Sequence, residues 1–150
     1  MLLLASNPIG DALNSSEYIF PILECFHITG FALSIGTIAI VDLRLLGLGM
    51  RNQTPAQLAT DVAPWTLAGL GVMLISGPMI FLSDAAMYLR NPSFRFKIGC
   101  LLVAIIFNYT IHRKVAMSNG SSSGLSKLVG ALSLLLWVGV VAGGLFIAFY

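Results

Sequence analysis

The hydrophobic positions of this chain fall into four long runs, and short polar segments separate them. A helix needs about 20 mostly apolar residues to cross the hydrocarbon core of a bilayer. Runs of this kind cover approximately Tyr18–Leu48, Pro64–Tyr88, Phe94–Ile111 and Leu125–Tyr150. The pattern therefore predicts an all-α fold, an integral membrane four-helix bundle in which residues 1–150 form a single transmembrane domain.

Local signals suggest where two of these helices begin and bend. Asn14 is followed three residues later by Glu17, a spacing that fits a capping box at the start of the first helix. Pro64 suits the first turn of the second helix, since a proline there loses no helical hydrogen bond. The pair Gly77-Pro78 lies inside the second run and should bend that helix.

The composition excludes most soluble classes of protein. Hydrophobic residues make up 57% of the chain and charged residues only 9%, whereas soluble domains contain about 25% charged residues. A soluble enzyme is therefore not expected, and no basic stripe supports nucleic-acid binding. The expected environment is a lipid bilayer, specifically the bacterial inner membrane.

The distribution of basic residues predicts the orientation of the helices. Five basic residues belong to the connections between helices one and two and between helices three and four, and three belong to the connection between helices two and three. Because cytoplasmic loops carry the excess of Lys and Arg, both termini are expected in the periplasm. The two sets are Arg44, Arg51, Arg113, Lys114 and Lys127 against Arg90, Arg95 and Lys97.

Polar residues in the first run share one half of a helical wheel. Glu24 and His27 are three positions apart, and Gly30, Ser34 and Asp42 fall on the same half. Ionisable residues inside a span are costly and usually face the interior of a bundle. The first helix is therefore expected to carry a polar inner stripe.

The third run has a similar stripe, formed by Lys97, Ala104, Asn108 and His112. Because helices one and three run in the same direction, position along each helix separates the polar residues into two groups at different depths. One group contains Glu24, His27, Asp84 and Lys97, and the other contains Asp42, Arg44, Asn108 and His112.

Residues from the first three runs also form a sequence signature. It includes Pro21-x-x-Glu24-x-x-His27-x-x-Gly30, the block Asp42-Leu-Arg-Leu-Leu-Gly47, Pro64-Trp65 and Tyr88-x-x-Asn-Pro-x-Phe-x-x-Lys97. This pattern resembles a family of small bacterial four-span inner-membrane proteins of unknown function. The family is similar, more loosely, to copper-resistance membrane proteins and four-helix b-type cytochromes, an analogy at the level of fold.

These features lead to one principal hypothesis, a membrane b-type haem protein for electron transfer or a small redox reaction. Histidine is a usual axial ligand of haem iron, and both histidines of the chain lie on inward stripes. The difference in depth favours two haem b groups, each with one histidine, over one shared haem. The predicted metal ligands are His27 and His112, and the further cofactor-binding residues are Glu24, Arg44, Arg95, Lys97, Asn108 and Arg113.

Two alternatives remain open at this point: a small proton or metal-ion transporter or channel using Glu24, His27 and Lys97, and an accessory subunit without chemistry of its own. Glu24 is the expected acceptor for the second nitrogen of His27. Asp42 and Arg44 are expected to act structurally, anchoring the end of the first helix. Glycine-rich faces on the fourth helix predict a homo-oligomer, and any redox partner is unknown.

Overall fold

The computed structural model describes residues 8–118 and 123–149, and these are helical almost throughout. The elements are α1 (Pro8–Asn14), α2 (Ile19–Leu45), α3 (Pro55–Ser83), α4 (Ala85–Arg90), α5 (Pro92–Phe107), η2 (Asn108–His112), α6 (Arg113–Ala116), α7 (Ser123–Leu145) and η3 (Phe146–Phe149). The described part of the chain contains no strand. The all-α prediction is confirmed.

Four helical segments are long and apolar enough to cross a membrane: Ile19–Leu45, Pro55–Ser83, Pro92–Ala116 and Ser123–Phe149. Many of their large apolar side chains point outward, among them Phe26 at 62% and Ile75 at 70% exposure. An outward apolar surface of this kind suits lipid and not water. The chain is therefore a multi-pass membrane protein.

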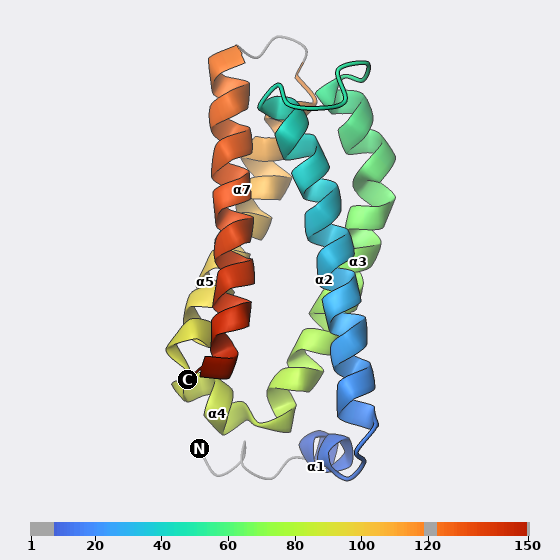
Figure 1. The fold of residues 1–150 in the computed structure, drawn as a ribbon, viewed down its shortest axis with the longest axis vertical. Coiled ribbons are helices and arrows are strands. Elements are labelled where there is room, and N and C mark those ends of the chain that lie inside the picture. Colours follow the sequence, from blue (N-terminus) through green and yellow to red (C-terminus); the bar gives the residue numbers. More distant parts are fainter. Residues whose placement is uncertain (1–7, 119–122, 150) are drawn as a thin grey trace.

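Figure 1 shows how the long helices are arranged. α2 and α3 lie side by side as one antiparallel pair, and α5 with α7 forms the other. The connection between α2 and α3 lies at the top of the view, and we call this the upper end of the bundle. α1 and α4 lie at the opposite, lower end, together with the end of the described chain.

The start of the second spanning helix differs from the sequence expectation. α3 begins at Pro55, not Pro64, because Thr54 forms a capping box with Gln57: the Thr54 hydroxyl accepts from the Gln57 N–H, and the Gln57 side chain accepts from the Thr54 N–H. Pro64 and Pro78 both lie inside this helix, which runs continuously past them.

Two further features at the helix ends differ from the sequence expectation. The second span does not reach Tyr88, because the backbone breaks at Asp84, whose carboxylate then caps the short helix α4 by accepting from the Met87 N–H. The capping box expected from Asn14 and Glu17 is wrong: Asn14 ends α1, and its side chain donates to the Ser83 carbonyl oxygen instead.

α2 and α3 approach each other closely at two glycines. A Cβ atom added to Gly69 would lie 2.6 Å from the Gly30 carbonyl oxygen, and one added to Gly30 would lie 2.9 Å from the Gly69 carbonyl oxygen. Small residues of this kind let membrane helices approach closely, since packing replaces the hydrophobic effect there. The close approach fixes the polar face of α2 against α3.

Candidate functional site

Three polar side chains from three helices meet in the buried interior at the upper half of the bundle. Asp42 of α2 is fully buried, His112 at the end of η2 is 4% exposed and Ser133 of α7 is 1% exposed. His112 Nε2 lies 2.6 Å from Asp42 Oδ1, and the Ser133 hydroxyl donates to Asp42 Oδ2 over 2.8 Å. We call these three residues the buried triad.

His112 lies at the end of an irregular turn in the third span. Residues Asn108–His112 form a π-helical turn, in which the Arg113 N–H bonds the Asn108 carbonyl oxygen five residues earlier. Such turns insert one extra residue into a helix and occur frequently at functional sites. The helix continues beyond the turn to Ala116, so the third span is longer than the predicted end at Ile111. Of the predicted inward stripe of Lys97, Ala104, Asn108 and His112, the last three are buried and Lys97 is half-buried.

The hydrogen bonds of the triad indicate its chemical character. The Ser133 hydroxyl donates to Asp42 Oδ2, and one proton lies between Asp42 Oδ1 and His112 Nε2, carried by the imidazole when the carboxyl group is ionised. Ser133 bonds the carboxylate and not the histidine, so the three residues do not form the serine–histidine–aspartate relay of a serine hydrolase. A carboxylate paired directly with an imidazole is instead suited to hold and exchange a proton.

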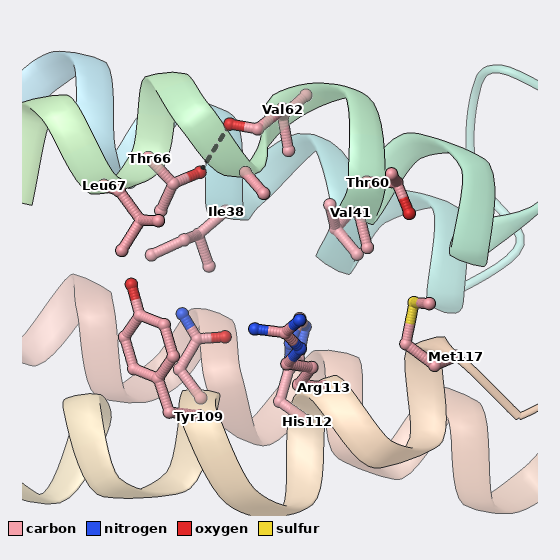
Figure 2. Close-up of a pocket in the computed structure, with 13 residues that line it drawn as sticks. Ile38, Val41, Thr60, Val62, Thr66, Leu67, Tyr109, His112, Arg113 and Met117 are labelled. Carbon is pink, nitrogen blue, oxygen red and sulfur yellow. Dashed lines mark hydrogen bonds between the residues drawn. The ribbon is translucent and has the colours of Figure 1, made fainter.

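A cleft of about 150 Å³ lies beside His112, between α3 and the segment formed by η2 and α6 (Figure 2). Its floor is the buried side chains of Ile38 and Val41 from α2, which are 4% and 3% exposed. Its rim includes the exposed residues Leu67 and Met117. The remaining lining residues are Ala59, Thr60, Val62, Ala63, Thr66, Asn108, Tyr109, His112 and Arg113.

A second polar group occupies the lower half of the bundle. His27 Nδ1 lies 2.8 Å from the Ser76 hydroxyl, which itself donates to the Val72 carbonyl oxygen over 2.7 Å. Because the hydroxyl has only one hydrogen, His27 is the donor in the first bond and carries its proton on Nδ1. Nε2 of His27 is then the ring nitrogen that can accept a proton.

Lys97 lies near this second group. Its ammonium is 5.6 Å from the centre of the Phe31 ring, within range of a cation–π interaction. Its side chain passes along two glycines of α7: a Cβ on Gly143 would lie 2.9 Å from Lys97 Cβ, and one on Gly144 would lie 3.4 Å from Nζ. In the described part of the chain no carboxylate lies within ion-pair distance of this ammonium.

Several predicted site residues lie away from these groups. Glu24 is exposed and is not the partner of His27, because Ser76 occupies that position. Arg95 is also exposed. Arg44 donates from Nε to the Gln53 carbonyl oxygen over 2.6 Å and so holds the connection between α2 and α3. Asp42 does not anchor the helix end with Arg44, because it is buried against His112 instead.

The two histidines are too far apart to share one metal ion. Asp42, which His112 contacts, follows His27 by fifteen residues on the same helix, or about 22 Å at 1.5 Å per residue. Two ligands of one metal place their nitrogens about 4 Å apart, since metal–imidazole bonds are about 2 Å. The described residues contain no cluster of three or more His, Cys, Asp or Glu side chains arranged to hold a metal.

The cleft beside His112 is small compared with a haem. A cavity of 150 Å³ is about the size that accommodates a benzene molecule in an engineered protein core. A haem is a tetrapyrrole and is several times larger than one such ring. The cleft of the single chain therefore does not fit a haem, and haem ligation by His27 and His112 stays a prediction.

Three residues of these groups are absent from the sequence-derived site. Ser133 and Ser76 lie on polar stripes of their helices, but a stripe alone does not show which side chain on another helix it contacts. Asp42 was assigned only a structural role, because it is two residues from Arg44 in the sequence. Its burial is the decisive signal, and the residues that contact it come from η2 and α7, which a single helix does not reveal.

Comparison with known proteins places the chain in a family. Residues 17–150 match the family described as "family of unknown function (DUF6644)", which covers nearly the whole chain. The chain therefore belongs to this family. No curated protein and no solved structure matched it.

Proposed function

We propose that this member of a family of unknown function transfers protons through the interior of its helix bundle, with Asp42 and His112 as the proton-binding pair. The observation that carries the proposal is the 2.6 Å contact between Asp42 Oδ1 and His112 Nε2, buried inside two membrane-spanning helices. Ionisable residues at such depth are costly and usually belong to ion or proton pathways.

Burial of a charged pair does not by itself indicate that Asp42 and His112 serve only to stabilise the bundle. Removing two charged groups from water costs several kcal/mol per ion, and a well-packed apolar pair of similar volume is often equally stable. Asp42 and His112 therefore have an advantage over Leu or Met only if their chemistry is used. A carboxylate and an imidazole in direct contact can share one proton, and a second proton on His112 Nδ1 makes the pair a carrier.

The cleft supports access to this pair from one side of the bundle. It is lined by His112 together with Thr60 and Arg113, whose polar groups reach the exposed rim. A proton can therefore reach the imidazole without crossing the packed core.

Polar side chains continue along the buried face of α2 towards the lower group. Thr37 Oγ1 lies 2.8 Å from Thr66 Oγ1 of α3, one turn before Asp42. Ser34 is fully buried, and its hydroxyl has no partner among the residues that the structure describes. His27 with Ser76 follows two turns further. The steps between these groups span one to two helical turns, so water must bridge them.

The proposal is tested with purified protein in liposomes that contain a pH-sensitive dye. A potassium gradient with valinomycin drives protons inward, and the rate of internal acidification is measured. The wild type is expected to acidify the lumen faster than empty liposomes do, and Asp42→Asn is expected to lose this excess rate. Asp61→Asn is the matched control, because Asp61 is exposed on α3 outside the pathway.

The outcomes separate the alternatives. If liposomes with the wild-type protein acidify no faster than empty liposomes, the proposal is contradicted and an accessory subunit is favoured. Equal rates for Asp42→Asn and the wild type contradict the role of the pair. The visible absorption spectrum of the same preparation tests the haem hypothesis directly, since a Soret band would be present only with haem bound.

A further inference from the structure

The cleft beside His112 has a shape and a chemistry that the transfer of protons alone does not require. About 150 Å³ is far more than a single water needs, since a water occupies about 30 Å³ of the liquid. It is close to the volume of a cavity that holds one benzene ring. Most of the lining surface is apolar, although six of the thirteen lining residues carry a polar side-chain group.

Besides the polar rim at Thr60 and Arg113, the cleft has an apolar side that faces lipid. Its floor residues on α2 are buried, whereas Leu67 on one wall is 54% exposed and Tyr109 on the other is 38% exposed. Figure 2 shows Leu67 and Tyr109 on opposite sides of the space, on α3 and on the π-helical turn. Both walls belong to membrane-spanning segments, so a molecule dissolved in the bilayer can enter sideways.

The polar wall can recognise an oxygen substituent on a ring. Asp42 holds Nε2 of His112, and in the described part of the chain Nδ1 of that ring has no hydrogen-bond partner. Without a proton, Nδ1 accepts a hydrogen bond from a ring hydroxyl, and with a proton it donates one to a ring carbonyl. A single group can therefore bind both the hydroxyl and the carbonyl form of the same compound.

We propose that this cleft binds the head group of a lipid-soluble benzoquinone, in its quinone or quinol form, with one ring oxygen on His112 Nδ1. The size of the cleft fits one six-membered ring, and the lateral opening fits a ligand with an apolar tail. The imidazole of His112, which Asp42 holds in place, fits the ring oxygen. The inference concerns binding and does not depend on net proton movement through the bundle.

The test uses an azido-benzoquinone with a decyl tail, photoactivated in liposomes of quinone-free phosphatidylcholine that contain the full chain. Peptide mapping by mass spectrometry is expected to find the label on residues 59–67 and 108–117. Unlabelled decylubiquinone should displace the label, and palmitic acid should not. Label spread over the outward faces of all four spanning helices, or equal displacement by palmitic acid, would overturn the proposal.

Two variants make the test specific. Ala63→Leu places a larger side chain in the cleft without changing the triad, and specific labelling is expected to fall about tenfold, which corresponds to about 1.4 kcal/mol. Ala68→Leu is the matched control, because Ala68 is exposed on α3 outside the cleft. Unchanged labelling of Ala63→Leu also contradicts the proposal. If Ala63→Leu fails to assemble, the position of the label on the wild type decides the question.

Discussion

His112 Nε2 lies 2.6 Å from Asp42 Oδ1, although the two residues are seventy positions apart in the sequence. Both side chains lie inside membrane-spanning helices and are almost completely shielded from solvent. Ser133 completes the arrangement by donating to the second carboxylate oxygen. The contact joins α2, the third span and α7, and it is central to the proposed chemistry of the bundle.

The first prediction concerns the stability of this contact. Asp42→Leu or His112→Leu alone leaves one buried polar partner without its ion pair, and each is expected to destabilise the protein by about 3–5 kcal/mol. The double variant Asp42→Leu/His112→Leu removes both groups and is expected to be more stable than either single variant. Unfolding in detergent by denaturant, followed by circular dichroism, measures the three differences.

The same series distinguishes stability from function. The double variant should fold but show no proton permeability above that of empty liposomes. A double variant less stable than both single variants would show that the pair itself stabilises the bundle. The role of the contact would then be structural.

The second prediction concerns the packing of α2 on α3. Gly69→Ala introduces a methyl group 2.6 Å from the Gly30 carbonyl oxygen, so the helices must separate and lose packing contacts. Overpacking of this kind typically costs about 1–3 kcal/mol. Gly71→Ala on the same helix is the control, because nothing lies within 4 Å of its added Cβ. Equal unfolding midpoints for the two variants would contradict the close contact.

The third prediction concerns Tyr88, which lies in α4 outside the spanning segments. Burial, reinforced by the negative charges of Glu24 and Asp84, raises the pKa of the Tyr88 hydroxyl above its usual value near 10. The folded state therefore keeps a proton that the unfolded state has released, and stability falls as pH rises from the ordinary pKa to the raised one. At neutral pH the group has no effect.

The ultraviolet absorbance of phenolate measures this titration, with Tyr88→Phe as the reference that isolates the signal of Tyr88. The midpoint is expected above that of a free tyrosine, and Glu24→Gln is expected to lower it. A midpoint at or below the ordinary value would mean that Tyr88 is solvated and distant from Glu24.

The fourth prediction concerns orientation. The five basic residues Arg44, Arg51, Arg113, Lys114 and Lys127 belong to segments at the upper end, and Arg90, Arg95 and Lys97 belong to segments at the lower end. The upper end, which has more basic residues, should face the cytoplasm, and this places the C-terminus in the periplasm. A reporter that is active only in the cytoplasm, fused after residue 150, should give no signal. A strong signal would reverse the orientation.

The sequence by itself determined the class of fold. Four apolar runs, each long enough for a bilayer, require helices because the backbone must satisfy its own hydrogen bonds in lipid. The polar stripe on α2 and the division into two depths also follow from helical periodicity, and the positions of His27 and Asp42 agree with both. These features are local, so the residues of one helix suffice to predict them.

The identity of each partner was decided only by the tertiary structure. Glu24 is the nearest carboxylate to His27 in the sequence, but Ser76 contacts His27, because the Gly30–Gly69 contact brings α3 against that face of α2. Asp42 is two positions from Arg44 in the sequence but pairs with His112, because the third span and α7 pack against this face of α2. Contacts between helices depend on how closely and at which rotation the helices pack, and the periodicity of a single helix contains neither quantity.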